Sequence, residues 1–324
     1  MKIIDLPGVT AGQRLEGSLL VCEVEQRGSG TQPFVLLTLG NSTGRIQSAP
    51  FWSEDLPQLD GVTRGRVVEV LGDVTTYRDR RQLRVSSIRA VPEERIDWRE
   101  MLPSVGDTRP YWRALDCWRS QIAAPRLRAI LALFYDDDAF RQRYDQCPAS
   151  ISGHHALLGG LLRHTWEVGT MARALCRTVP ADPDLLLAGV LLHDIGKIEA
   201  YSWNRAFEIT NRGYLLGHVA LGSQMLNERA GQRDPAVAPM AELDLLQHLI
   251  LSHHGKLEFG APVEPMTLEA ELLHHADNAS ARSDSMAKAV ATQDNFNGDE
   301  LVSARNIWQL DRRRVFRGKS TWGL

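Results

Sequence analysis

Six histidine and aspartate side chains interrupt largely apolar segments in the second half of the sequence. They occur in GGLLRHTWEVGTMA, LLHDIGK, YLLGHVALGSQML, LILSHHGKLEFG and EAELLHHADNA, as His164, His193, Asp194, His218, His253 and Asp277. A buried carboxylate without a partner is costly, so Asp194, which follows the run LLLAGVLLH, needs a hydrogen bond, a basic residue or a metal ion. Because every segment is predicted to be helical, the set predicts a metal site inside a helical bundle.

The other histidines have simpler interpretations. His248 lies inside LLQHLIL, where a hydrogen-bonded core histidine is expected. His274 and His275 come just before Asp277 and could support a ligand rather than bind the metal themselves. His154 and His155, in SGHHALLGG, are expected to cap a helix or contact the substrate.

The elements that must position these residues change character along the chain. Residues 1–153 contain no histidine, and their apolar pattern is strand-like in RLEGSLLVCEVEQ, PFVLLTLGN, RIQSAPFW, GRVVEVLGDVTTY and RQLRVSSIRAV. Five short β-branched runs separated by Gly, Asn, Asp and Ser turns predict a small closed or partly open barrel over residues 1–92.

Proline and charge gather after the barrel, and residues 93–110 are expected to be a linker or docking segment. From residue 111 to 310 the Leu, Ala and Ile spacing is helical. The tail, residues 311–324, is basic and aromatic, and two interpretations stay open for it: an arm packed on its own domain, or a contact with a polyanion.

Composition narrows the functional classes. The formal net charge of −3 excludes a globally basic nucleic-acid binder, so any such function must rest on a local site. The four cysteines form no CxxC pair, which favours a reduced, cytoplasmic protein. Since no apolar stretch reaches roughly 18 residues, neither export nor a membrane span is expected.

The ordered pattern H, HD, H, H, D, with LLRHT before it and SHHG after it, resembles the HD-domain superfamily of metal-dependent phosphohydrolases. With the preceding barrel, almost the whole chain resembles the YhaM-type 3'-5' exoribonucleases. The resemblance implies a multidomain protein, an N-terminal OB-type β-barrel followed by an all-α HD domain.

The resemblance also implies a ligand set. One metal ion would be held by His164, His193, Asp194 and Asp277, and a second by Asp194, His218 and His253. Asp194 suits the bridging position because a carboxylate offers two oxygens. His254 is expected to be a further ligand or a phosphate contact. Gly160 stands where some relatives have a glutamate for a third ion, which implies two ions.

The ligand types also indicate which metal ions suit the site, and a nearby lysine is a candidate for contact with the substrate. Mixed imidazole and carboxylate ligands suit manganese, iron, cobalt, nickel or zinc, and the family favours manganese. Lys197 lies about one helical turn beyond His193 and is expected to contact the substrate phosphate, so Asp194 and Lys197 are the predicted catalytic residues. The alternative for Lys197 is a solvated surface lysine. Arg163 replaces a glutamate common in similar proteins, which alters contacts around the ligands.

The barrel is expected to hold a nucleic-acid strand by combining basic and aromatic side chains. The predicted stacking residues are Phe34, Trp52 and Tyr77, and the predicted backbone contacts are Arg78, Arg80, Arg81 and Arg84. The alternatives are an aromatic barrel core and a solvated hairpin at TYRDRRQLR.

The sequence therefore predicts a metal-dependent 3'-5' exonuclease acting on single-stranded RNA, with some activity on DNA and with a homo-oligomer as one option. Two alternatives stay open. One is an HD hydrolase of cyclic nucleotides, nucleoside triphosphates or alarmones. The other is a non-catalytic nucleic-acid-binding protein.

Overall fold

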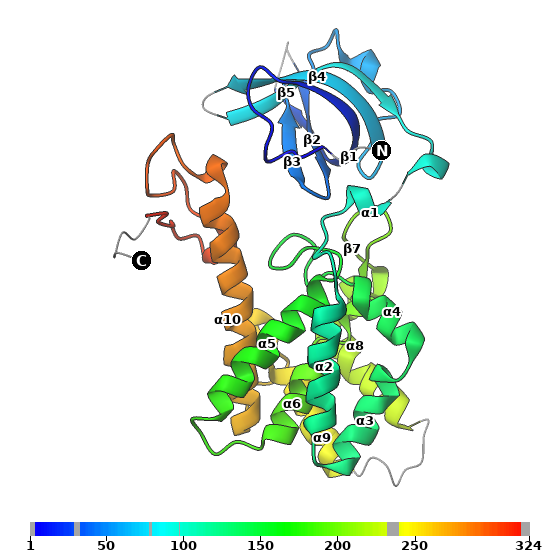
Figure 1. The fold of residues 1–324 in the computed structure, drawn as a ribbon, viewed down its shortest axis with the longest axis vertical. Coiled ribbons are helices and arrows are strands. Elements are labelled where there is room, and N and C mark those ends of the chain that lie inside the picture. Colours follow the sequence, from blue (N-terminus) through cyan, green and yellow to red (C-terminus); the bar gives the residue numbers. More distant parts are fainter. Residues whose placement is uncertain (1–3, 29–32, 78–79, 97, 232–239, 319–324) are drawn as a thin grey trace.

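The structure is a computed structural model that describes residues 4–28, 33–77, 80–96, 98–231 and 240–318. Figure 1 shows two parts, a barrel of strands and a group of helices, joined near α1 (Trp98–Met101). Across the described part of the chain, no helix has both the length and the apolar character needed to cross a membrane.

The N-terminal part is a closed barrel. Within the described residues its strands are β1 (Arg14–Arg27), β2 (Phe34–Asn41), β3 (Gly44–Ser48), β4 (Val67–Tyr77) and β5 (Arg80–Ala90). They pair in the order β1-β2-β3-β5-β4, and β4 returns to β1; only β3 and β5 run parallel. Alternate Leu, Ile and Val side chains fill the interior. The barrel predicted from the strand pattern is confirmed, as is the OB type that the family resemblance implies.

The second part is built from helices. They are α2 (Arg109–Gln121), α3 (Pro125–Tyr135), α4 (Asp138–Gln146), α5 (Gly160–Cys176), α6 (Pro183–Leu192), α7 (Lys197–Ala200), α8 (Asn211–Gly231), α9 (Met240–Ser252) and α10 (Leu268–Ala291). One local feature departs from the all-α expectation, since β6 (Tyr201–Ser202) and β7 (Glu208–Ile209) pair as a short antiparallel hairpin between α7 and α8. The helical domain itself is confirmed.

Helix α6 forms the centre of this part. Its sequence PDLLLAGVLL is apolar all round, and seven of its residues are buried, as expected for a helix enclosed by others. Asp182 caps its first turn by accepting hydrogen bonds from the backbone N–H groups of Asp184 and Leu185. The cap fixes where the enclosed helix begins, and His193 and Asp194 follow directly after its last residue, Leu192.

The two parts share an apolar core. Leu20 of β1 and Val67 of β4 pack with Met101, Leu102 and Phe207, and all five side chains are buried. The connection also makes short 3-10 turns, including η2 (Glu93–Arg95). The barrel is therefore packed directly on the helical domain.

The chain after α10 packs back on that helix. It contains η4 (Gln293–Asn295) and η5 (Trp308–Leu310). Ile307, Leu310 and Val315 are buried against Ala289 and Phe296. Figure 1 shows this segment at the end of α10 that points toward the barrel. The described part of the tail, up to residue 318, is thus tied to its own domain.

Candidate metal centre

Five elements bring the predicted ligands together. His164 lies on α5, His193 and Asp194 follow α6, His218 lies on α8, His253 and His254 follow α9, and Asp277 lies on α10. His164, His193, Asp194 and His253 are almost completely buried. Their donor atoms therefore face one another in a space from which solvent is largely excluded.

Two glycines allow the elements to approach. A Cβ on Gly196, in HDIGK, would lie 2.0 Å from the carbonyl oxygen of His218, so only glycine permits this contact with α8. Gly217 has a φ of 73° and breaks α8 directly before His218. The break turns His218 toward Asp194.

Asp194 lies at the centre, with one oxygen toward each group of ligands. Its Oδ2 is 3.2 Å from His193 Nε2 and 3.5 Å from His164 Nε2. Its Oδ1 is 3.4 Å from His218 Nε2 and 3.6 Å from His253 Nε2. The carboxylate therefore has the geometry of a bridge between two sites.

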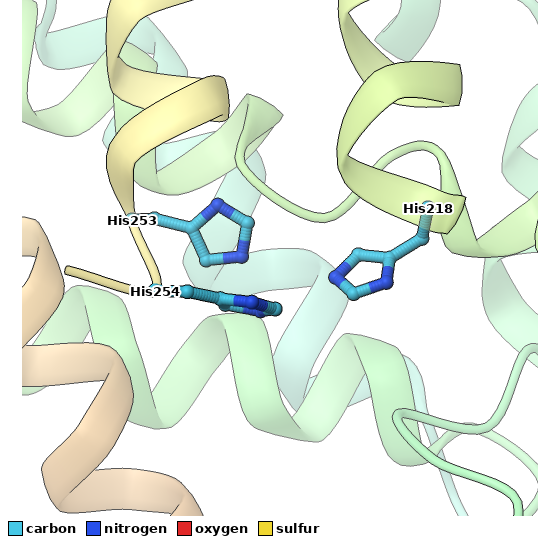
Figure 2. Close-up of side chains that lie close together, drawn as sticks. All are labelled: His218, His253 and His254. Atoms are coloured by element: carbon cyan, nitrogen blue, oxygen red, sulfur yellow. The ribbon is translucent and has the colours of Figure 1, made fainter. Parts of the chain in front are cut away.

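The histidines and Asp277 fall into two matching triads. His164, His193 and Asp277 form one, and His218, His253 and His254 form the other, with the donor atoms of each triad within 4.8 Å of one another. Figure 2 shows the second triad, with His253 and His254 directed toward His218. His254 is thus grouped with the predicted ligands.

Backbone hydrogen bonds fix which ring nitrogen faces the site. The Nδ1–H groups of His193, His253 and His254 donate to the carbonyl oxygens of Val190, Ile250 and Phe259, at 2.7, 2.7 and 2.8 Å respectively. In each neutral ring the Nε2 lone pair is then free toward the site, which is the form that binds a metal ion.

Burial keeps most of these imidazoles neutral. Burial, with the Lys197 ammonium nearby, lowers the pKa of His218 to about 3. Burial and the adjacent His254 hold the pKa of His253 well below its usual value. His193 differs, because burial opposes its protonation but the Asp194 carboxylate outweighs burial and raises its pKa.

The donor atoms fit divalent cations. Among the described residues, the Nε2 atoms of His193, His218 and His253 and the Oδ1 atom of Asp194 are buried without any hydrogen-bond partner, and such orphaned atoms are rare unless something else satisfies them. Two ligands bonded at about 2.1 Å and at right angles are about 3 Å apart. The 3.2–3.6 Å separations around Asp194 are close to this spacing.

His164 gives a second test of the fit. Burial lowers its pKa, and its Nδ1–H donates to Ser280 Oγ at 3.0 Å. Its Nε2 therefore presents a lone pair to the Asp277 Oδ1 atom, 2.9 Å away. Two acceptors face each other favourably only with a cation or a proton between them. This first triad, too, is suited to a metal ion.

Lys197 is buried at the centre, rather than solvated on the surface. Its side chain is 5% exposed, and its Nζ donates to Asp194 Oδ2 at 2.6 Å. Burial would lower the pKa of Lys197, but Asp194 outweighs burial and raises it, so the ammonium keeps its charge. The predicted phosphate contact of Lys197 stays a prediction.

A buried network behind His164 was not anticipated from the sequence. Ser280 Oγ donates to Glu167 at 2.9 Å, and His155 Nε2 donates to the same carboxylate at 2.8 Å. The backbone N–H of His155 donates to Asp284, and Arg163 donates to Glu167. Glu167 follows His164 by three positions, and Ser280 follows Asp277 by three, so helical spacing was the available signal.

This network gives His155 a supporting position, while His154 points elsewhere. The ring of His154 is 5.0 Å from that of His164, and its Nε2 is buried without a hydrogen-bond partner in the described structure. A Cβ on Gly160 would lie 2.0 Å from the His155 carbonyl oxygen. Packing therefore requires glycine at this position, where some relatives have a glutamate for a third ion.

The remaining histidines take outer positions. His248 Nε2 accepts a hydrogen bond from the backbone of Met266, and His274 Nδ1 donates to the His253 carbonyl oxygen. His275 pairs with Glu271 on the surface. Of these three histidines, and within the described part of the chain, His274 is the one with a hydrogen bond to a predicted ligand residue.

The predicted strand-binding aromatics are accessible on the barrel. The rings of Phe34 and Trp52 are 5.0 Å apart, Trp52 is 41% exposed and Tyr77 is 58% exposed. Arg80 and Arg84 are exposed on β5, while Arg78 lies outside the described residues.

Arg81 has a different position from the one expected of a strand contact. Its Nη1 donates to the carbonyl oxygens of Leu6, Pro7 and Val9, at 3.1, 3.0 and 2.7 Å. Three carbonyl contacts tie its guanidinium to the N-terminal segment, which restrains its reach toward a strand.

The fold and the centre together define an HD-domain protein with an OB-type barrel in front, and the family model described as "HD domain" matches residues 161–282. Three relatives carry the name 3'-5' exoribonuclease YhaM. That of Bacillus subtilis (strain 168) is 33% identical over 86% of this chain and 88% of its own length. That of Shouchella clausii is 32% identical over 94% of each chain, and that of Bacillus licheniformis is 34% identical over 81% and 82%. The chain belongs to the YhaM family.

Proposed function

We propose that this protein is a metal-dependent 3'-5' exoribonuclease, which hydrolyses phosphodiester bonds from the 3' end of single-stranded RNA. One observation carries the proposal: the carboxylate of Asp194 lies between two ligand triads, with an oxygen toward each. The family of relatives and the barrel in front of the centre support RNA as the substrate.

In this proposal His164, His193, Asp194 and Asp277 would hold one divalent ion, and Asp194, His218, His253 and His254 the other. Divalent ions held there would neutralise charge on the phosphate and make water nucleophilic. The mixed nitrogen and oxygen ligands favour manganese over magnesium.

The protein's own groups supply orientation and access. His218, His254 and Asp277 are the partly exposed ligands, with the side chains of His218 and Asp277 17% and 15% accessible, so the substrate phosphate approaches from their side. The buried side chains behind them exclude bulk water, which strengthens each charge interaction. We expect two further groups beside the ligands to contact the phosphate: Lys197 Nζ, which also donates to Asp194, and His154 Nε2, which has no hydrogen-bond partner in the described structure.

The test is a cleavage assay on single-stranded RNA labelled at the 5' or the 3' end, with manganese. A 5'-labelled strand should shorten progressively, while a 3'-labelled strand should release labelled mononucleotide at once. Asp194→Ala should abolish cleavage and lower bound metal while the barrel still binds RNA. Hydrolysis of mononucleotides alone, or cleavage by the Asp194→Ala variant at the normal rate, would contradict the proposal.

The same assay with single-stranded DNA measures the substrate preference, for which we propose RNA first and DNA as a weaker substrate. The separated cysteines lead us to propose a cytoplasmic location as well.

A further inference from the structure

Arginines from two distant parts of the chain line one cavity between the barrel and the segment after α10. The cavity has a volume of about 290 Å³, and Arg45, Arg80, Arg81 and Arg305 contribute to its walls together with Gln47 and Asn295. Its described lining contains no aspartate or glutamate. In a chain with a net charge of −3, such a concentration of positive charge marks a site for an anion.

The strand register explains why two of these arginines are neighbours. Gln47 of β3 pairs in parallel with Gln82 of β5. Arg45 and Arg80 each precede these residues by two positions, so they extend from the same face of adjacent strands. Both guanidinium groups also line the cavity, where they can act together on an anion that enters it.

The opposite wall is held in place by backbone contacts. The Ala304 N–H donates to the Asn295 carbonyl oxygen at 2.7 Å, and Ser303 Oγ donates to the Arg305 carbonyl oxygen at 2.9 Å. The buried core formed by Ile307 and its neighbours fixes the same segment on α10. Arg305 is therefore presented to the cavity from a braced backbone, although its own side chain is exposed.

We propose that residues 292–317 and the β2-β3-β5 face of the barrel form a two-sided groove that grips the phosphate backbone of single-stranded RNA. This inference rests on the proposed exoribonuclease function. Neither Arg305 nor Arg45 was expected from the sequence to touch RNA, and the tail acquires a substrate-binding role in addition to packing. Arg45 and Arg80 on one wall and Arg305 on the other present guanidinium groups to the same space, while Arg81 keeps its contacts with the N-terminal segment. Guanidinium groups on two walls suit a phosphate chain better than a single small anion.

Helix α10 sets the distance from this groove to the metal centre. Asp277 lies fourteen residues before the end of α10 at Ala291, about 21 Å at a rise of 1.5 Å per residue. A stacked strand covers that distance with about six nucleotides at about 3.4 Å each. A trinucleotide bound at the centre is therefore too short to reach the groove.

The test compares charge-reversal variants from the two walls, Arg305→Glu and Arg45→Glu, with Arg177→Glu as the matched control. Arg177 is an exposed arginine at the end of α5 and is not part of the cavity lining. Binding of a 20-nucleotide single-stranded RNA is measured by fluorescence anisotropy in EDTA. Cleavage of this RNA and of a trinucleotide is measured with manganese.

Each wall variant should weaken binding of the long RNA by about tenfold and lower kcat/KM on it similarly. The slope of log affinity against log salt should fall by about one. Trinucleotide cleavage should not change, Arg305→Lys should retain most of the affinity, and Arg177→Glu should behave as the wild type.

The outcomes separate this inference from the proposed function. Equal effects of all three glutamate variants, or no effect from either wall variant, would overturn the groove while wild-type cleavage still supports the exoribonuclease. Loss of trinucleotide cleavage in the wall variants would also overturn it, because the substitution would then act on the centre. Absence of RNA cleavage by the wild type would instead refute the proposed function.

Discussion

Lys197 is expected to have two effects at the metal centre: its ammonium stabilises the buried Asp194 carboxylate when no metal is bound, and it repels a metal ion bound there. The two effects can be measured separately. Without metal, its ammonium is the closest positive charge to the buried carboxylate, at 2.6 Å. Removing one partner of a buried ion pair typically costs about 3–5 kcal/mol of stability. With metal bound, Asp194 has other cations, and Lys197→Met should cost less than about 1.5 kcal/mol, as a volume-conserving change does.

The cost of Lys197→Met should thus be about 3 kcal/mol larger without metal than with metal, which corresponds to roughly 6–12 °C in the unfolding temperature of a domain of this size. Scanning calorimetry of the wild type and Lys197→Met, in EDTA and in manganese, measures it directly. By thermodynamic linkage the variant should also bind metal about 100-fold more tightly, because a repelling charge has been removed. Lys256→Met, at a lysine whose side chain is 64% exposed, is the control and should change little in either condition.

An equal loss of stability in EDTA and in manganese, with unchanged metal affinity, would refute this reasoning. Lys197 would then stabilise the fold through packing alone. Kinetics on the same variant address the phosphate contact predicted from the sequence. If Lys197 contacts the phosphate only in the transition state, Lys197→Met should lower kcat without loss of metal, and Lys197→Arg should restore part of the activity.

Three further predictions concern the surroundings of the centre and the barrel. Burial opposes ionisation of Glu167, but hydrogen bonds, the strongest from His155, outweigh burial and lower its pKa to about 2. Glu167→Gln should thus cost about 3 kcal/mol above pH 4.5, and the difference from the wild type in urea titrations should vanish as the pH falls toward 2. His154→Ala should lower kcat by at least about tenfold at unchanged metal content, because its unpartnered Nε2 beside His164 is the group we expect to donate to the bound phosphate; parallel loss of metal would contradict this. Trp52→Ala should weaken binding to single-stranded RNA by about tenfold or more in anisotropy measurements, through lost stacking beside Phe34, and unchanged affinity would exclude a stacking role.

The architecture and the candidate ligand residues could be predicted because their signals are local, whereas the grouping of these ligands into two sites came from the family resemblance. Strand alternation and turn residues indicate the barrel, and polar residues that interrupt apolar helices stand out in the printed sequence. Asp194 is an example, since its neighbours in LLLAGVLLHD are buried. Periodicity and composition are sufficient for such features.

Contacts between distant segments could not be predicted in this way. The hydrogen bond from His164 to Ser280 joins residues 116 positions apart, and Arg81 reaches the N-terminal segment across more than 70 positions. Nothing near Arg305 in the sequence indicates that a barrel strand faces it. Tertiary packing alone determines these partners. Arginine and lysine side chains are also long enough to reach several alternative hydrogen-bond partners.

The apolar core shared by the barrel and the helical part has a consequence for dissecting the protein. A fragment cut between the two would expose Met101, Leu102 and Phe207 on one piece and Leu20 and Val67 on the other. Exposed patches of this kind promote aggregation. Insolubility of the isolated helical fragment would therefore say nothing about its catalytic competence. Polar replacements at these positions should accompany any attempt to express the halves alone.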